Sequence, residues 1–273
     1  MISTGGVDAR FIYLSIATRK RPNDPFLLVH EAGQTDQTVG DVRKMVRVLI
    51  LGAGGHARVV ADAVLSLLPK RESLELMGFL DDDPELVQKR ILGKPVLGSL
   101  ADLRNIPHDA VVIGIGDNET RRRFFVKLSD QGEEFATVIH PRATLARDTI
   151  VGRGTVVFAG AIVNTGSLIG NNVIVNTGCT VDHNCKVGSH SHVCPGAHLG
   201  GTVVVGEGTF VGIGSTIINN ITIGEWSIIG GGAAVIKDVL PNNTVVGVPA
   251  RELPTRPLRT KPDTRDSGLS LFD

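Results

Sequence analysis

Histidines that could act as acid–base groups are concentrated in one short stretch of the chain. The segment NTGCTVDHNCKVGSHSHVCPGAH contains half of the eight histidines, namely His183, His190, His192 and His198. Solvated turns give no reason for such a cluster, whereas a reaction in which an amine or hydroxyl acts as nucleophile needs a base that removes its proton. A neutral imidazole suits that step. The cluster therefore predicts a general base, and a transfer that uses one requires no covalent enzyme intermediate.

A glycine loop near residue 50 is the second candidate for binding chemistry. Gly52, Gly54 and Ala57 form a G-x-G-x-x-A pattern between the apolar run VRVLIL and an apolar-periodic helix, with Gly55 and His56 in the same loop. Glycines allow a tight turn and let a phosphate reach the backbone amides of the helix N-terminus, whose dipole favours an anion. The loop predicts a bound nucleotide but does not say which one.

Three expected strands place this loop at one edge of a sheet. Apolar runs that alternate with helical segments lie at 46–51, 74–80 and 110–116. This order is typical of a small parallel sheet of Rossmann type, whose ligands bind at the carboxyl ends of the strands. Asp81, Asp82 and Asn118 follow two of these ends. The acidic pair lies further from the loop than the roughly 20 residues of a dinucleotide fingerprint, so hydride transfer with NAD is the weaker interpretation.

The histidines themselves lie in a repeat with a period of six. Aliphatic residues occupy every sixth position without a break at Ile139, Leu145, Val151, Val157, Val163, Ile169, Val175, Val181, Val187, Val193, Leu199, Val205, Val211, Ile217, Ile223, Ile229 and Val235. Such a period fits one short strand and one turn, and three units close a triangular coil of about 18 residues. Stacked coils bury the aliphatic column and pair their backbones. A purely structural β-solenoid is the alternative interpretation.

Two sets of motifs give the chain a resemblance to known proteins. The array VGRGTVVFAGAIVNTGSLIGNNVIVNTGCTVDHNCKVG resembles the hexapeptide-repeat acyltransferases, which implies a left-handed parallel β-helix. Together with ILGAGGHARVVADAV, FLDDD and VVIGIGDNETRRR, it is similar to the sugar acyltransferases named for sialic acid O-acetyltransferases. That family includes N-acetyltransferases of nucleotide-linked 4-amino sugars. The resemblance runs from about Met45 to Arg251 and implies a nucleotide-binding α/β domain followed by the β-helix.

The resemblance implies roles for individual residues in the β-helix. The family's catalytic histidine lies in a motif of acid, histidine, polar residue and cysteine, which DHNC matches at His183. Several relatives have a carboxylate directly after this histidine, whereas this chain has Asn184. Either Asp182 supplies the carboxylate or Asn184 orients the ring through its amide oxygen. Asn176 and His192 match positions near the acetyl group and the sugar amine, although His192 could equally be a turn histidine at a subunit interface.

The resemblance also implies where the two substrates bind. The residues expected at the nucleotide sugar are Gly52, Gly54, Gly55, His56, Asp81, Asp82, Asn118, Asn176 and His192. The acidic pair has a plainer alternative as a solvated turn after a strand. The stretch GGGAAVIKDVLPNNTVVGVPARE is similar to the CoA-proximal end of many hexapeptide acyltransferases, which implies that Gly212, Gly230 and Lys237 lie near acetyl-CoA. Relatives form homotrimers through the β-helix with active sites at subunit boundaries.

Composition narrows the remaining function classes. The 273 residues carry 28 basic and 28 acidic side chains with one Trp and one Tyr, which argues against nucleic-acid binding. No run approaches the roughly 20 apolar residues of a membrane span, and the N-terminus is a poor signal peptide. The three cysteines lie inside the array, where packing explains them, and their odd number fits a reducing cytoplasm.

Histidine clusters also occur in metal sites, and some left-handed β-helix proteins are zinc-type carbonic anhydrases. Those sites use a histidine pair spaced by five and a third histidine about two coils away. The cluster here has spacings of 7, 2 and 6, so no metal is expected.

The sequence divides into four segments. An extension is expected at 1–44, a Rossmann-like nucleotide-sugar domain at 45–135, a β-helix acyltransferase domain at 136–250 and a flexible tail at 251–273. Met45 is an alternative start. We predict an acetyl-CoA-dependent N-acetyltransferase acting on a nucleotide-linked 4-amino-6-deoxy sugar, with His183 as base. Acetylation of a sugar hydroxyl and a non-catalytic nucleotide-sugar-binding protein are the alternatives.

Overall fold

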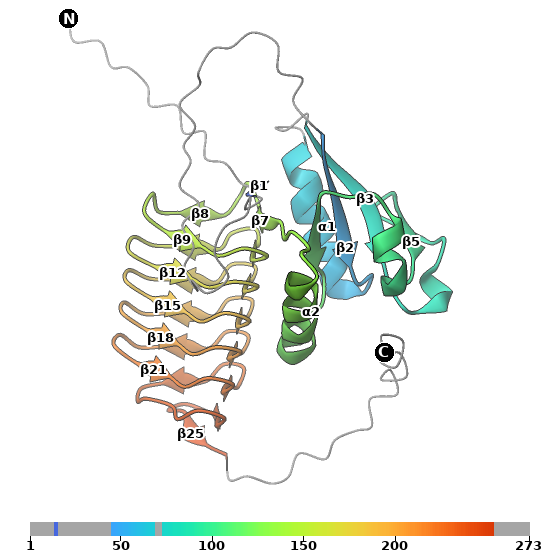
Figure 1. Ribbon diagram of the computed structural model, residues 1–273. Helices are drawn as coiled ribbons and strands as arrows, with labels where there is room; N and C mark the ends of the chain where they lie inside the picture. Colours follow the sequence, from blue (N-terminus) through green and yellow to red (C-terminus); the bar gives the residue numbers. More distant parts are fainter. Residues whose placement is uncertain (1–13, 16–44, 69–72, 254–273) are drawn as a thin grey trace, which may run out of the picture.

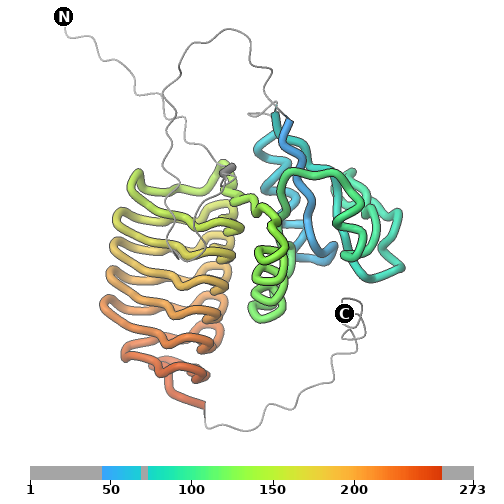
Figure 2. Tube along the Cα trace, viewed as in Figure 1, coloured from blue at the N-terminus to red at the C-terminus, as the bar shows by residue number. Residues whose placement is uncertain are grey.

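The computed structural model describes residues 14–15, 45–68 and 73–253. These residues form a small α/β domain beside a tall stack of coils (Figures 1 and 2). Most of the extension expected at 1–44 and the tail beyond residue 253 lie outside the described residues. Two residues of the extension, Leu14–Ser15, form β1, which pairs antiparallel with the first strand of the stack.

The α/β domain contains a five-stranded sheet in the order β4-β5-β3-β2-β6. Its elements are β2 (Val46–Leu51), α1 (Gly55–Leu67), β3 (Leu74–Leu80), η2 (Pro84–Leu86), β4 (Arg90–Ile91), β5 (Lys94–Gly98), η3 (Leu100–Asn105), β6 (Ala110–Ile113) and α2 (Asn118–Asp130). The strands β5, β3, β2 and β6 are parallel, as expected for a Rossmann-like sheet. The sequence pattern missed the edge pair β4–β5, because proline and glycine interrupt the apolar run that indicates a strand.

The second unit is a left-handed parallel β-helix with three faces. The first face contains β7 (Thr137–Ile139), β10 (Val156–Val157), β13 (Ile174–Val175), β16 (His192–Val193), β19 (Phe210–Val211), β22 (Ile228–Ile229) and β24 (Thr244–Val246). The second contains β8 (Thr144–Leu145), β11 (Ile162–Val163), β14 (Thr180–Val181), β17 (His198–Leu199), β20 (Thr216–Ile217) and β23 (Ala234–Val235). The third contains β9 (Ile150–Val151), β12 (Leu168–Ile169), β15 (Lys186–Val187), β18 (Val204–Val205) and β21 (Thr222–Ile223).

The register of the faces confirms the predicted coil. Val157 pairs with Val175, and Val175 with Val193, so neighbouring strands of a face are one coil apart in sequence. The inward aliphatic positions form one continuous core, and only those of the first coil, Ile139, Leu145 and Val151, are partly exposed. Among the described residues, no further coil lies above this first one, which explains the difference.

The stack ends later than the sequence indicated. Arg251–Glu252, which the sequence pattern places in the flexible tail, form β25 and pair antiparallel with β24. The short hairpin continues the first face by backbone hydrogen bonds, which a run rich in charge and proline does not reveal.

The turns between faces stack into three columns, which we call corners. The first corner joins the first face to the second and contains the turn after β13. The second corner joins the second face to the third and contains the turn after β14. The third corner joins the third face back to the first and contains the turn after β15. In a triangular coil, the second corner lies opposite the first face.

The α/β domain packs on the first face and the third corner. One side of its sheet, with α1, shares a hydrophobic core with β7, β10 and β13 of the first face. The other side of the sheet packs with α2. As Figure 1 shows, α2 stands along the stack rather than across it. The second corner therefore lies on the side of the stack away from the α/β domain of the same chain.

Helix α2 contacts the third corner on four consecutive coils. Its contacts climb the stack from Asn118 on Gly208, to Arg121 on His190 and Asn172, to Phe125 beside Gly154. These helix positions are i, i+3 and i+7, which share one face of a helix. A helix turn rises about 5.4 Å and neighbouring strands lie about 4.8 Å apart, so two turns of α2 run beside this corner, and the long Arg121 side chain spans two of its coils.

Candidate functional site

His183 lies exposed in the turn of the second corner. Its ring Nδ1 is 3.1 Å from Nδ2 of Asn184, and its carbonyl oxygen accepts a hydrogen bond of 2.8 Å from the Thr202 backbone. Asn184 has a φ of 57°, a left-handed conformation that asparagine tolerates better than most residues. The ring lies over Gly201 of the next coil, because a Cβ built on Gly201 would be 2.6 Å from its Nε2. The turn thus holds an accessible imidazole in one orientation.

Asp182 supports the backbone of this turn. Its Oδ1 accepts hydrogen bonds of 2.7 Å from the His183 backbone N–H and 2.9 Å from Nδ2 of Asn164. The Asn164 hydrogen bond, followed by that of the His183 backbone, lowers the pKa of Asp182. Of the two candidates for orienting the His183 ring, Asn184 therefore makes the contact, while Asp182 fixes the main chain.

A second group of expected site residues lies where the α/β domain meets the first face. Nδ2 of Asn176 is 2.9 Å from Nε2 of His192, and Oδ1 of Asn176 accepts the Thr177 backbone N–H. The rings of His56 and His192 have centroids 6.3 Å apart. Phe210 contacts His192 edge-on at 5.4 Å. The glycine loop thereby brings His56 next to the β-helix residues Asn176 and His192.

Both of these histidines are neutral near pH 7. Burial, and then the charge of Arg121, lower the pKa of His56 to about 4. The same two causes, followed by repulsion from His56, lower the pKa of His192 to about 3. Nε2 of His56 is buried and has no hydrogen-bond partner within the described part of the chain. The pair can offer neutral donors and acceptors, but at pH 7 it has little tendency to accept a proton.

The glycine loop has the geometry of an anion site at a helix N-terminus. Gly52 has a φ of 97°, and its N–H donates to the Leu80 carbonyl oxygen at 2.7 Å. Gly54 is the N-cap of α1, where no side chain caps the helix and no acidic residue stands in the first turn. A Cβ built on Gly54 or Gly55 would meet no atom within 4 Å. Backbone amides can therefore approach a phosphate closely here.

The two acidic residues after β3 accept hydrogen bonds from the backbone of the loops at this edge of the sheet. Asp81 accepts the Ala53 backbone N–H at 2.6 Å and the Asp83 N–H at 2.9 Å, so it holds the glycine loop in shape. Asp82 is exposed and accepts the Leu100 N–H at 2.9 Å. Both carboxylates lie at the carboxyl edge of the sheet, as expected, and both already have backbone donors.

Asn118 joins the two units. It is buried, and its Nδ2 donates to the carbonyl oxygens of Gly208 and Thr209 at 3.0 and 3.2 Å, while its Oδ1 accepts from Arg121 at 2.8 Å. The side chain that we expected at the sugar is thus occupied by contacts between the units.

The residues expected near CoA lie on two different corners. Gly212 and Gly230 are at the first corner, where a Cβ would overlap the Ile229 carbonyl oxygen or approach the Val246 side chain at 2.7 Å. Glycine at these positions is required by the stacking of coils. Lys237 is exposed at the second corner, in the same column as His183.

The expected catalytic base and the expected substrate residues are therefore not brought together within one chain. His183 lies on the second corner, opposite the first face that carries His192. Asn176 lies on the first corner, and His56 comes from the α/β domain on the first face. The second corner and the first corner of a single stack therefore cannot complete one site together.

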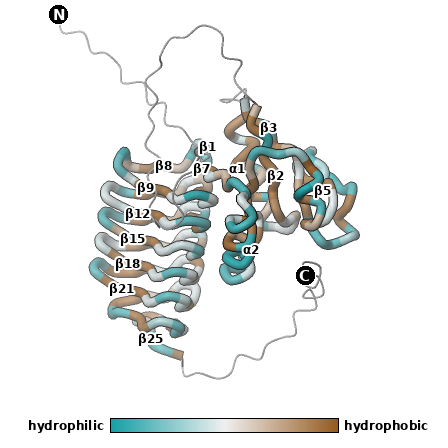
Figure 3. Tube along the Cα trace, viewed as in Figure 1, coloured by the Kyte–Doolittle hydropathy of each residue, from teal (hydrophilic) through white to brown (hydrophobic). Residues whose placement is uncertain are grey.

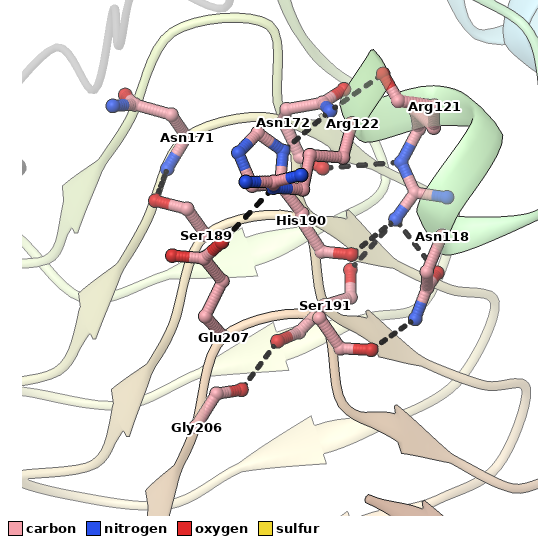
Figure 4. Close-up of polar contacts among 11 residues, drawn as sticks. Asn118, Arg121, Arg122, Asn171, Asn172, Ser189, His190, Ser191, Gly206 and Glu207 are labelled. Atoms are coloured by element: carbon pink, nitrogen blue, oxygen red, sulfur yellow. Dashed lines mark hydrogen bonds and ion pairs between the residues drawn. The ribbon is translucent and has the colours of Figure 1, made fainter. Parts of the chain in front are cut away.

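Sequence reasoning missed Arg121, the most engaged polar residue of the contact between the units. It is 1 % exposed, and its guanidinium donates to oxygens of both units (Figure 4). The run Arg121, Arg122 and Arg123 indicated only a basic helix start, and Figure 3 shows α2 as largely hydrophilic. The i, i+3, i+7 spacing with Asn118 and Phe125 was the signal that could have identified its buried face.

Neither a metal cluster nor a membrane span is found in the described part of the chain. No group of three or more His, Cys, Asp or Glu side chains is arranged to hold a metal ion there. No helix among residues 45–68 and 73–253 is long and apolar enough to cross a bilayer.

Known proteins share both the fold and the sequence motifs. Residues 47–128 match the PglD N-terminal domain family. The acetyltransferase domain of PglB from Neisseria gonorrhoeae is 35% identical, covering 76% of this chain and 99% of that chain with a TM-score of 0.71. The chain belongs to the family of PglD-type sugar acetyltransferases. Another structure of the Neisseria domain, 34% identical, holds acetyl coenzyme A and has a TM-score of 0.72 over 77% and 100% of the two chains.

Two other members of the PglD-type family have named sugar substrates. Perosamine N-acetyltransferase from Caulobacter crescentus, solved with CoA and GDP-perosamine, is 35% identical, with a TM-score of 0.69 over 76% of this chain and 97% of that chain. UDP-N-acetylbacillosamine N-acetyltransferase from Bacillus subtilis is 36% identical over 119 residues, 42% of this chain. The match spans 52% of the Bacillus protein, about half its length.

Proposed function

We propose that this protein transfers the acetyl group of acetyl-CoA to the amine of a nucleotide-linked 4-amino-6-deoxy sugar. The observation that carries the proposal is the exposed imidazole of His183, held over Gly201 and contacted at Nδ1 by Asn184. The Caulobacter relative, matched along 97% of its length, was solved with CoA and GDP-perosamine, which supports an amine of a nucleotide sugar as the acceptor.

His183 acts as general base in this mechanism. Its Nε2 accepts a proton as the sugar nitrogen attacks the thioester carbonyl, forming the C–N bond. The tetrahedral oxyanion collapses, the C–S bond breaks, and the imidazolium returns the proton to the CoA thiolate. A base at Nε2 requires the proton at Nδ1, where the amide oxygen of Asn184 accepts it once the amide is turned over. The imidazolium gains less from this neutral partner than from a carboxylate.

The nucleotide binds at the edge of the α/β sheet. The amides of Gly54 and Gly55 take the diphosphate, and Asp82 lies near the ribose or base. His56, Asn176 and His192 face the sugar. Three neutral polar side chains can hydrogen-bond an uncharged amine or an acyl carbonyl without competing for the proton that His183 removes. Gly212, Gly230 and Lys237 mark the surface along which CoA extends.

The functional unit is a homotrimer with active sites between subunits. Because His183 lies on the second corner, opposite the first face where His192 meets His56, a second copy is expected to bring the two groups together. A cyclic arrangement of three copies would repeat that contact identically and close the ring. Acetyl-CoA as donor and three free buried cysteines fit the cytoplasm as its location.

The test measures thiol release from acetyl-CoA with UDP-, GDP- and dTDP-linked 4-amino sugars, together with the mass and N-linkage of the product. His183→Ala is compared with His198→Ala, which removes an exposed histidine of the second face. Release with one nucleotide class, lost only in His183→Ala, supports the proposal. Release with hydroxyl acceptors alone would make the protein an O-acetyltransferase. Nucleotide-sugar binding without any release would make it a binding protein.

A further inference from the structure

Arg121 is a buried cation whose hydrogen bonds all go to neutral oxygens. Its guanidinium donates to the carbonyl oxygens of Ile115, Gly116, Asn172, His190 and Ser191 and to Oδ1 of Asn118, at 2.7 to 3.4 Å. Within the described residues it forms no ion pair with a carboxylate. A fully buried charge without a paired counter-charge is costly, so its place needs an explanation beyond stability.

These contacts cross the boundary between the units. The carbonyls of Asn172 and His190 belong to the third corner of the β-helix, while those of Ile115 and Gly116 follow β6 of the α/β domain. Asn172 returns a hydrogen bond from its Nδ2 to the Arg121 carbonyl oxygen at 3.3 Å. Figure 4 shows the guanidinium meeting the oxygens of the stacked turns from the end of α2.

The segment that Arg121 holds lies beside the glycine loop. A Cβ built on Gly116 would be 3.9 Å from Cβ and Cγ of His56. His56 in turn lies next to His192 of the β-helix. Arg121 therefore fixes the backbone that sets how far the helix N-terminus of α1 stands from the first face.

The positive charge of Arg121 also acts on the histidines at the boundary between the units. Burial lowers the pKa of Arg121 to about 10, and the charge of Asp117 opposes that shift, so the guanidinium is still protonated at pH 7. The charge of Arg121 is the second cause, after burial, that lowers the pKa of His56, His190 and His192. An anion bound at the glycine loop would supply the counter-charge that the buried arginine lacks.

We propose that Arg121 is a positioning residue of the nucleotide-sugar site, which spaces the glycine loop from the β-helix and supplies charge that favours a bound nucleoside diphosphate. This inference rests on the proposed function for its substrate but not for its geometry. It makes the acceptor half of the site depend on Arg121, while the acetyl-CoA half, on the outer corners of the stack, does not.

The test uses Arg121→Lys, which keeps the charge but not the planar fork, and Arg121→Met, which removes both. Arg123→Lys is the matched control, because Arg123 is an exposed neighbour on the same helix that contacts Thr120. We expect KM for the nucleotide sugar to rise about tenfold or more in both Arg121 variants, in line with lost charge-assisted hydrogen bonds. KM for acetyl-CoA should stay within about twofold, and Arg123→Lys should match wild type.

A second measurement separates this inference from the proposed reaction. Binding of UDP, GDP and dTDP is followed by calorimetry, and the histidine rings by NMR titration, neither of which needs turnover. Weaker nucleoside diphosphate binding in both variants, with histidines titrating at higher pH in Arg121→Met, supports the inference even if wild type transfers no acetyl group. Unchanged binding, equal rises of both KM values, or wild type that binds none of the three would overturn it.

Discussion

The ring of His183 rests on Gly201, the residue one coil below it at the second corner. A Cβ at Gly201 would stand 2.6 Å from the ring Nε2, closer than side chains approach one another, so the absence of that atom defines where the imidazole lies. Gly201 is therefore needed for the orientation of the His183 ring and not for a backbone conformation of its own.

Gly201→Ala should therefore impair catalysis without unfolding the protein. The methyl group displaces the ring from its contact with Asn184, and we expect kcat to fall by about the 100-fold or more that a misplaced general base costs. The ring is exposed and can move into solvent, so the melting temperature should change little. Steady-state kinetics and a thermal melt check this, with His183→Ala as the reference for full loss. A Gly201→Ala enzyme with wild-type kcat would show that the ring position is irrelevant.

Asn184→Asp should move the acid limb of the kcat–pH profile to higher pH. A carboxylate next to Nδ1 favours the protonated imidazole, which strengthens the base but demands a higher pH to free it. The left-handed φ of 57° also suits aspartate, so the turn should persist. Asp182→Asn serves as the comparison, because Asp182 contacts the backbone and not the ring. Equal shifts in both variants would contradict the assignment of Asn184 to the ring.

Gly55→Ala should weaken substrate binding while leaving the fold intact. No atom lies within 4 Å of the added methyl group, and alanine is favoured over glycine by about 0.5–1 kcal/mol in a helix. The same methyl group stands where a phosphate would approach the helix N-terminus. We expect KM for the nucleotide sugar to rise about tenfold, with KM for acetyl-CoA unchanged and the melting temperature equal or higher. A lower melting temperature with unchanged KM would place the diphosphate elsewhere.

Acid should destabilise the protein through its neutral histidines before its carboxylates protonate. His56, His190 and His192 have folded pKa values of about 4, 4 and 3, below the ordinary 6.5. The unfolded chain therefore binds more protons below pH 6.5, and stability falls with acidification until the folded pKa is reached. Each histidine contributes up to about 1.4 kcal/mol per pH unit.

Urea unfolding at several values between pH 5 and 7 measures this slope. His190→Asn, which keeps a residue suited to the left-handed φ of 64°, should reduce the slope by up to about 1.4 kcal/mol per pH unit, whatever its effect at pH 7. His198→Asn, at an exposed position, should leave the slope unchanged. Identical slopes in wild type and His190→Asn would show that folding does not lower the pKa of His190. Hydrogen bonds lower the pKa values of Asp148 and Asp182, so these carboxylates become protonated only below the pH range of this experiment.

Two inactive variants should restore each other if the site is shared between copies. His183→Ala damages the second corner, and His192→Ala damages the first face. In trimers mixed at random from equal amounts, about a quarter of the sites combine an intact second corner with an intact first face. We expect about that fraction of wild-type activity after co-refolding, checked against each variant refolded alone. No recovery in verified mixed trimers would place the whole site within one chain.

The coil could be predicted from the sequence because every step of it is local. Six-residue spacing alone fixed which side chains point inward and which strands pair, as the register of Val157, Val175 and Val193 shows. The glycine loop followed for the same reason, since a strand, a tight turn and a helix are consecutive in the chain. The histidine turn at His183 was found by motif, and its position on an exposed turn agrees with the use we propose.

What could not be predicted depends on contacts between distant segments. Arg121 reaches residues 51, 69 and 70 positions away, and no period in the sequence links them. Asp81 resembles any acid after a strand until the loop that it holds, 28 residues earlier, is seen. The separation of His183 from His192 follows from the triangular section of the coil, since nine residues can lie half a turn of the stack apart.

The contacts between α2 and the third corner set the height along the stack at which the α/β domain docks. Each contact from Asn118 to Phe125 falls on a particular coil. An extra coil inserted between Gly154 and Gly208 would keep the repeat, but the side chains of α2 would then face turns other than the ones they now contact. A coil added beyond Trp226, whose ring centroid lies 5.8 Å from Cζ of Arg122 on α2, would disturb none of these contacts. Coils can therefore be gained or lost at the far end of the stack, while the number of coils beside the α/β domain must stay the same.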